Sequence, residues 1–148
     1  MLTSDTEYKR TLGTIRNTEK MVEDQIAKFR AEGVSEAAIE MCVGFTRGLL
    51  RDMHKEATEY KSLKEGHIPT FSVDEPGISL VRLRIASGKS QKDLADLLGV
   101  SAAQVSRDER REYYNVSWHR VVEIVRLLGY HVEVKVSTNA RKFERDRK

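Results

Sequence analysis

Residues 78–109, ISLVRLRIASGKSQKDLADLLGVSAAQVSRDE, decide the fold of this 148-residue chain. They predict three short helices that are separated at Gly88-Lys89 and at Gly99-Val100, because glycine accepts the positive φ that ends a helix. The last two helices, joined by a tight glycine turn, have the layout of a DNA-binding helix-turn-helix. The pattern therefore indicates nucleic acid as a partner.

Serine residues mark the start of both helices of this motif. The hydroxyls of Ser90 and Ser101 can accept hydrogen bonds from the exposed amides of a first helical turn. Val100 and Val105 flank the second cap at the two positions of a hydrophobic staple. The apolar face of the first helix consists of Leu94, Ala95, Leu97 and Leu98. Because caps, turn and apolar pattern agree, they favour this motif over an unspecific helical hairpin.

Residues 78–129 resemble the lambda-repressor-like, Xre-type helix-turn-helix domain. The residues that carry the resemblance are Arg84, Ser90-Gln91, Leu94-Ala95, Gly99-Val100-Ser101, Val105 and Glu109. The resemblance implies that helix 90–98 lies on the DNA backbone and that helix 102–110 enters the major groove. It also implies a partly buried ion pair between Arg84 and Glu109. Removing one partner of such a pair usually costs more than the intact pair contributes.

The resemblance also assigns the DNA contacts. The base-reading positions are Ala102, Ala103, Ser106 and Arg107, and the phosphate contacts are Ser90, Gln91, Lys92, Arg110 and Arg111. Helix N-termini favour anions, which suits a phosphate beside Gln91. Alanine can only pack on a thymine methyl, so Arg107 is the strong hydrogen-bonding reader, with guanine as its natural target. The structural alternative for Arg107 is a salt bridge to Asp108 or Glu112.

The sequence departs from the family pattern at the end of the second helix of the motif. The family commonly has a small residue after the position of Glu109, whereas this chain has Arg110-Arg111-Glu112. This difference predicts a recognition helix that is longer by one turn. With few hydrogen-bonding readers, DNA shape would supply part of the specificity.

The charges are unevenly distributed along the chain. Residues 1–66 carry 11 basic and 12 acidic side chains, residues 67–136 carry 10 and 9, and residues 137–148 carry 5 and 2. The N-terminal part, with a net charge of −1, therefore has no electrostatic reason to bind DNA. The basic tail 137–148 can follow a phosphate backbone or act as a solubilising end.

Residues 1–65 predict an α-helical hairpin. Apolar side chains of residues 8–29 follow a four-three spacing, Gly33 breaks the pattern, and Ser35 can cap a second helix. The second helix has a wide apolar stripe, on which the single cysteine, Cys42, is predicted to be buried. A lone hairpin buries too little surface to be stable. It should therefore pack on the DNA-binding domain, on its copy in a dimer, or on another protein.

Residues 66–77 predict a linker, because glycine and proline cluster there. Residues 130–136, YHVEVKV, alternate apolar and polar side chains and predict a half-buried strand. Its partner would be residues 70–73 or the same strand of a second copy across a two-fold axis. The predicted architecture is mainly α, with an N-terminal helical hairpin, a lambda-repressor-like helix-turn-helix domain over 78–136 and one C-terminal β-strand.

The sequence predicts neither catalysis nor a cofactor. It has no Cys/His cluster, no glycine-rich phosphate loop and no serine elbow. His119 and Glu123 have a spacing that could hold a metal, but a solvated pair explains them better. The chain shows no signal peptide and no apolar run of membrane length, which predicts a cytoplasmic, nucleoid-associated protein without a membrane partner.

Together these features predict a sequence-specific repressor that binds double-stranded DNA as a homodimer. The arrangement, the short chain and the C-terminal strand also resemble HigA-type antitoxins. That resemblance implies an autoregulating antitoxin with a cognate toxin as its partner. Two alternatives remain open: a stand-alone phage or mobile-element repressor whose hairpin only dimerises, and a protein-interaction module that does not bind DNA.

Overall fold

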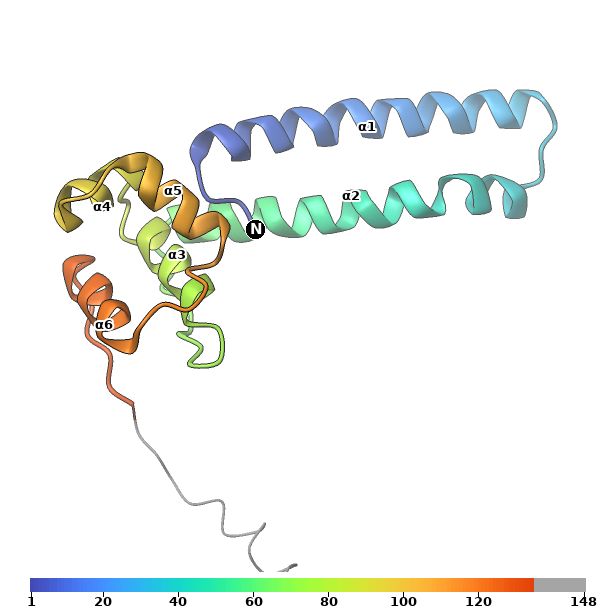
Figure 1. Cartoon of the computed structure of the whole chain (residues 1–148). Coiled ribbons are helices and arrows are strands. Elements are labelled where there is room, and N and C mark those ends of the chain that lie inside the picture. Colours follow the sequence, from blue (N-terminus) through green and yellow to red (C-terminus); the bar gives the residue numbers. More distant parts are fainter. Residues whose placement is uncertain (135–148) are drawn as a thin grey trace, which may run out of the picture.

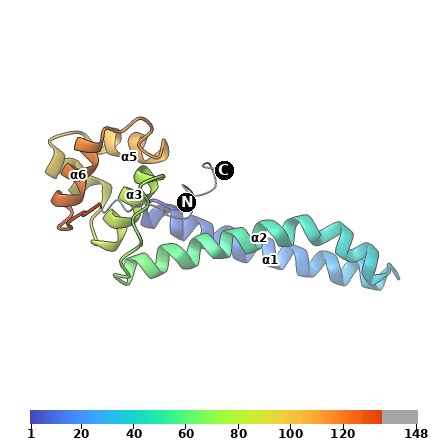
Figure 2. The ribbon, with the colours of Figure 1, turned by 90° about the horizontal axis from the view of Figure 1, so that it is seen from below.

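The structure is a computed structural model that describes residues 1–134, and it is mainly helical (Figure 1). The helices in this range are α1 (Asp5–Ala31), α2 (Glu36–Lys64), α3 (Pro76–Ala86), α4 (Gln91–Leu98), α5 (Ala102–Arg110) and α6 (Trp118–Leu127). This confirms the prediction of a mainly helical chain. The long antiparallel pair α1 and α2, called the arm below, projects from a bundle formed by α3 to α6 (Figure 1, Figure 2).

Serine caps and a glycine turn define the two helices of the arm. Ser4 Oγ accepts a hydrogen bond from the Glu7 amide at 3.3 Å, and Ser35 Oγ accepts one from the Ala38 amide at 3.4 Å. Between the helices, Gly33 adopts a φ of +74°, which L side chains rarely adopt. At 1.5 Å of rise per residue, each helix is about 40 Å long.

The arm has a narrow core of its own. Its buried cluster consists of Ile15, Val22, Val43, Leu50 and Ala57, and Ile39 of α2 is buried as well. They form one seam between two helices, so most of the arm's surface faces solvent. The contact between α1 and α2 therefore buries only a small part of the arm's surface.

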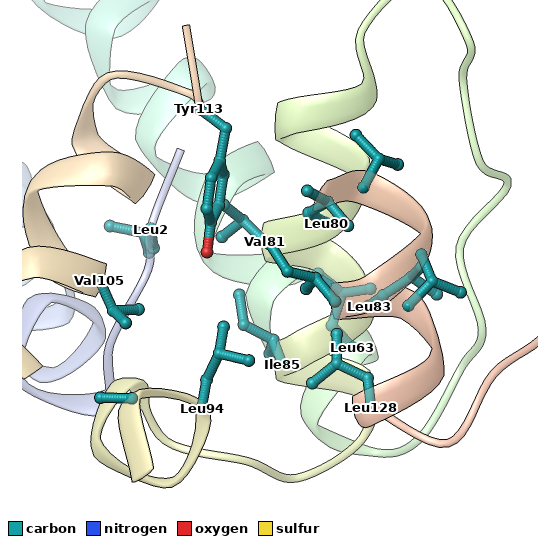
Figure 3. Close-up of a cluster of buried hydrophobic side chains, with 14 of the residues drawn as sticks. Leu2, Leu63, Leu80, Val81, Leu83, Ile85, Leu94, Val105, Tyr113 and Leu128 are labelled. Carbon is teal, nitrogen blue, oxygen red and sulfur yellow. The ribbon is translucent and has the colours of Figure 1, made fainter. Parts of the chain in front are cut away.

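The bundle has a larger core, to which every helix of the bundle contributes (Figure 3). Its members from these helices include Leu80, Val81, Leu83, Ile85, Leu94, Ala95, Val105, Val121, Ile124 and Val125. Leu2, Tyr60 and Leu63, from the base of the arm, belong to the same cluster. The hairpin thus packs on the bundle, while the division of the chain at residues 65 and 78 stays a prediction.

No strand is seen in the described part of the chain. Residues 130–134 are not assigned to a strand, and neither are residues 70–73, which were its proposed partner within the chain. Tyr130 and Val132 instead pack, partly buried, against the bundle core. Because a strand needs a paired neighbour, the C-terminal strand remains a prediction. Residues 135 and 136 and the basic tail 137–148 lie outside the described residues.

Two local predictions are wrong. Cys42 is exposed, because α1 covers the side of α2 that holds Val43 and Leu50 and leaves the other edge of the wide stripe uncovered. The longer recognition helix is also not found, since α5 ends at Arg110. Glu112 and Tyr113 adopt φ values of +51° and +49°, and this left-handed backbone cannot continue a helix.

Candidate nucleic-acid interface

The turn between α4 and α5 is fixed by caps on both helices. Ser90 and Asp93 form a reciprocal capping box, in which the Ser90 hydroxyl accepts from the Asp93 amide at 3.1 Å and Asp93 Oδ2 accepts from the Ser90 amide at 2.8 Å. These hydrogen bonds from the Ser90 backbone and hydroxyl lower the pKa of Asp93. Gly99 ends α4 with a φ of +65°, and the Ser101 hydroxyl accepts from the Gln104 amide to begin α5. The two helices are therefore held in a defined helix-turn-helix.

A buried ion pair connects this motif to α3. The Nη2 atom of Arg84 lies 2.7 Å from Oε2 of Glu109, and the side chains of these residues are only 3% and 0% exposed. Arg84 also donates through Nη1 to the Lys89 carbonyl at 2.8 Å. Glu109 accepts from Gln91 Nε2 at 2.8 Å. One hydrogen-bonded cluster thus joins α3, the start of α4 and the end of α5.

The base of the arm reaches the same cluster. The Thr3 carbonyl accepts from Arg84 Nη2 at 2.7 Å, in the buried interior. The Thr3 amide and hydroxyl both donate to Glu7 Oε2 at 2.8 Å. Burial raises the pKa of Glu7, but these hydrogen bonds outweigh it and the pKa is lowered. Sequence reasoning missed Thr3, because nothing in its neighbourhood indicates a contact with a residue so distant in the chain.

The predicted phosphate contacts lie around the start of α4 and the end of α5. Ser90, Lys92, Arg110 and Arg111 are exposed. The half-buried Gln91 side chain donates its hydrogen bond to Glu109. A phosphate at the start of α4 would therefore be bound by backbone amides rather than by the Gln91 side chain. A cavity of about 420 Å³ opens beside Ser90, Gln91 and Lys92 and is also lined by Lys64 of the arm, a residue that the sequence pattern does not indicate.

The predicted base-reading residues share the outer side of α5. Ala102 and Ala103 are exposed on its first turn, and Ser106 accepts a hydrogen bond from Arg110 Nη2 at 3.1 Å. The exposed Arg107 donates through Nη2 to Gln104 Oε1 at 2.8 Å, rather than to either of the carboxylates considered as alternatives.

Gln104 is a second residue that sequence reasoning missed. Its Nε2 donates to Asp108 Oδ1 at 2.7 Å, while its Oε1 accepts from Arg107. Asp108 therefore orients Gln104, and Gln104 orients Arg107. The signal in the sequence was the spacing of three and four residues between these polar side chains, which places them together on one side of a helix.

The loop after α5 is packed closely against the start of α3. A Cβ atom at Gly77 would lie 1.7 Å from the Glu112 carbonyl oxygen, so only glycine fits there. Tyr113 is buried in the bundle core, whereas Tyr114 is 81% exposed. Of the two tyrosines, only Tyr114 is thus placed to contact a sugar-phosphate backbone.

Four helices with a capped α4–α5 turn define a helix-turn-helix domain. Residues 77–135 match the family model described as a helix-turn-helix domain. No curated protein and no solved structure matches the chain. The matched residues cover α3 to α6 and support a helix-turn-helix DNA-binding regulator, while the arm lies outside the match.

Residues 1–134 contain neither a candidate metal site nor a candidate membrane-spanning helix. Within that range no group of three or more His, Cys, Asp or Glu side chains could hold a metal ion. Among the described helices, none is both long enough and apolar enough to span a membrane.

Proposed function

We propose that the protein is a sequence-specific transcriptional repressor of the Xre type, which binds an operator as a homodimer. The observation that carries this proposal is the arrangement of α4 and α5: an open, capped α4 N-terminus beside an α5 whose outer side presents Arg107. In this proposal α4 rests on the DNA backbone, α5 enters the major groove, and RNA polymerase is excluded from the promoter. The protein would act in the cytoplasm, on the nucleoid.

The chemistry of the exposed residues supports this reading. Arg107 can donate two hydrogen bonds to O6 and N7 of a guanine, and the methyl groups of Ala102 and Ala103 can pack on thymine methyls. Gln104 lies close enough to hold the guanidinium in place. The N-terminal amides of α4, with Ser90 and Lys92, suit one phosphate, and Arg110 and Arg111 suit others.

The test is a titration of the purified chain with the duplex upstream of its own gene and with a scrambled duplex of equal length. We expect a preference of at least about 100-fold at physiological salt. Arg107→Ala should remove about 1–3 kcal/mol of this discrimination, because it deletes the bidentate contact. The matched control is Arg126→Ala, which removes an exposed arginine from α6, outside the motif. Equal loss in both variants would show that α5 does not read the bases.

A more specific form of the proposal is an autoregulating antitoxin of the HigA type. The feature that favours it is the arm, which projects from the bundle and exposes large apolar side chains that could contact a toxin. The test is to express the adjacent reading frame alone and with this chain. Toxicity that this chain relieves, with co-purification of the two products, would support the antitoxin. A harmless neighbour would leave the stand-alone repressor.

A protein-interaction module that does not bind DNA is the remaining alternative. The same titration decides it, because such a module would bind neither duplex. Equal, salt-sensitive binding to both duplexes would instead indicate a backbone binder without an operator of its own.

A further inference from the structure

The half of the arm that is distant from the bundle has an uncovered apolar surface. Met41 and Phe45 are each 86% exposed, and Leu49 is 49% exposed. Their spacing of four residues places them in one row along α2. The exposed Cys42 adjoins this row. Contiguous exposed apolar surfaces are typical of contacts with another molecule.

This row is separate from the core of the arm. The buried residues of α2 in the arm seam are Val43, Leu50 and Ala57, which α1 covers. The row at Met41, Phe45 and Leu49 thus contributes little to the stability of the single chain. The apolar composition of this row must therefore have a physical reason other than the stability of the single chain.

Two glycines within α2 have no explanation inside the chain either. A glycine within a helix costs about 1 kcal/mol relative to alanine. A Cβ atom at Gly44 would meet nothing within 4 Å, and one at Gly48 would approach only the end of the Arg51 side chain, at 3.8 Å. Both glycines lie beside the exposed row, where they leave recesses that let another helix approach closely.

We propose that a second copy of this chain covers the row. The α2 helices of two copies would pack antiparallel across a two-fold axis near Phe45, with Met41 of each copy opposite Leu49 of the other. The large side chains of one helix would enter the recesses at Gly44 and Gly48 of its partner. Such an interface is self-complementary, as a two-fold axis requires. It deepens the proposed function, which needs a dimer, by naming the surface that forms it.

The charges beside the row favour the antiparallel direction. Asp52 follows Phe45 by seven residues, and Ala38 precedes it by seven, so both lie on the same side of α2. An antiparallel pair places Asp52 opposite Ala38 of the second copy. A parallel pair would place Asp52 of one copy opposite Asp52 of the other, and these like charges would repel each other. The antiparallel direction also opposes the two helix dipoles.

This geometry separates the two DNA-binding domains. From Phe45 to the end of α2 at Lys64 the helix rises about 28 Å, so the bases of two antiparallel arms would lie about 57 Å apart. That exceeds the roughly 34–36 Å between half-sites one DNA turn apart. The interface therefore predicts operator half-sites separated by two or more helical turns.

The first test is the mass of the full chain in solution without DNA, measured by light scattering or sedimentation equilibrium. We expect a dimer for the native chain and a monomer for Phe45→Lys, with unchanged helical content by circular dichroism. Gly44→Leu should also give a monomer although it raises helix propensity, because it fills a recess. The control is Tyr114→Lys, which charges an aromatic residue of similar exposure in the loop after α5 and should remain dimeric.

A second readout uses the native cysteine. A short bis-maleimide should link Cys42 of two copies in the native dimer, and the link should disappear in Phe45→Lys. A native chain that stays monomeric, or a Phe45→Lys variant that stays dimeric, would overturn the proposal. Binding of a neighbouring gene product to a monomer through Phe45 would overturn it as well.

These outcomes are separable from the proposed function. If the dimer is lost in Phe45→Lys but the native chain binds no DNA, the interface stands and the repressor proposal fails. If the native chain discriminates its operator as a monomer, the interface fails, and of the proposed function the operator binding stands while the homodimer does not.

Discussion

The arm and the bundle contain similar apolar side chains, but they bury them very differently. The arm has one seam of five buried residues, whereas the bundle gathers side chains from α3 to α6 and from the arm's base into one cluster. The bundle buries the ion pair Arg84–Glu109, whereas ion pairs of the arm such as Arg30–Glu36 are exposed. Regions with many buried contacts rarely unfold locally. Regions with few buried contacts unfold locally more easily. The bundle, together with the arm's base, is thus expected to open less readily than the rest of the arm.

Removing residues 1–64 should have the largest effect on this comparison. The deletion takes Leu2, Tyr60 and Leu63 from the bundle core and takes the Thr3 carbonyl from Arg84. We expect the remaining fragment to lose its cooperative thermal transition, as measured by circular dichroism. A fragment that melts cooperatively and still binds DNA would show that the bundle is rigid without the arm.

Breaking the buried ion pair should have the next largest effect. Glu109→Ala leaves the Arg84 guanidinium buried without its carboxylate, which should lower the free energy of unfolding by about 3–5 kcal/mol in urea denaturation. The control Asp96→Ala removes an exposed carboxylate from α4 and should change it by less than about 0.5 kcal/mol. Combining Arg84→Met with Glu109→Leu should recover part of the loss, because it removes both charges but leaves the buried Thr3 carbonyl without its donor. Equal effects of Glu109→Ala and Asp96→Ala would contradict the role of burial.

Two matched truncations compare the cores directly. Leu80 in the bundle is 1% exposed and Leu50 in the arm is 8% exposed. Leucine-to-alanine changes in cores cost about 2–5 kcal/mol, and the cost is higher where the surroundings cannot collapse. We expect Leu80→Ala near the upper end of this range and Leu50→Ala near the lower end, by urea denaturation. A larger loss of stability in Leu50→Ala than in Leu80→Ala would contradict the comparison of the two cores.

The smallest expected effect concerns the α4 cap and its dependence on pH. The pKa of Asp93 is lowered from its ordinary value of 3.8 by the hydrogen bonds from Ser90. The cap therefore stabilises the folded chain at pH above the ordinary value, and this contribution is lost as the pH falls through the lowered pKa. Asp93→Ala should lower the melting temperature at neutral pH. The difference from the native chain should disappear in acid, and a difference that persists there would exclude the carboxylate as its cause.

Sequence patterns predicted those parts of the fold that depend on near neighbours. The capping serines Ser90 and Ser101, and the glycine at 99, act within one or two turns of helix, so their roles can be read from local spacing. The helical composition and the helix-turn-helix follow from such signals. The exposure of Cys42 could not be predicted, because a wide apolar stripe does not tell which edge a neighbouring helix covers.

The contacts that complete the candidate site were harder to predict. Gln91 can serve a phosphate or a neighbouring carboxylate, and only the packed structure brings Glu109 within reach of its side chain. Gln104 was missed for a similar reason, since its two hydrogen bonds need both Arg107 and Asp108 in place. Polar side chains with several suitable partners are placed by tertiary contacts, not by local preference.

The hydrogen bond between Arg84 and Thr3 joins residues that are 81 positions apart. Chains are synthesised from the N-terminus, so α1 and α2 can pair as soon as both have emerged. Thr3 and Leu2, at the base of the arm, can make their contacts with the bundle only after Arg84 and Glu109 have been synthesised. Contacts between distant residues form slowly because a long loop must close. The order of folding during synthesis is therefore arm first and helix-turn-helix last, so that each new molecule would carry the proposed dimer surface on α2 before its helix-turn-helix is complete.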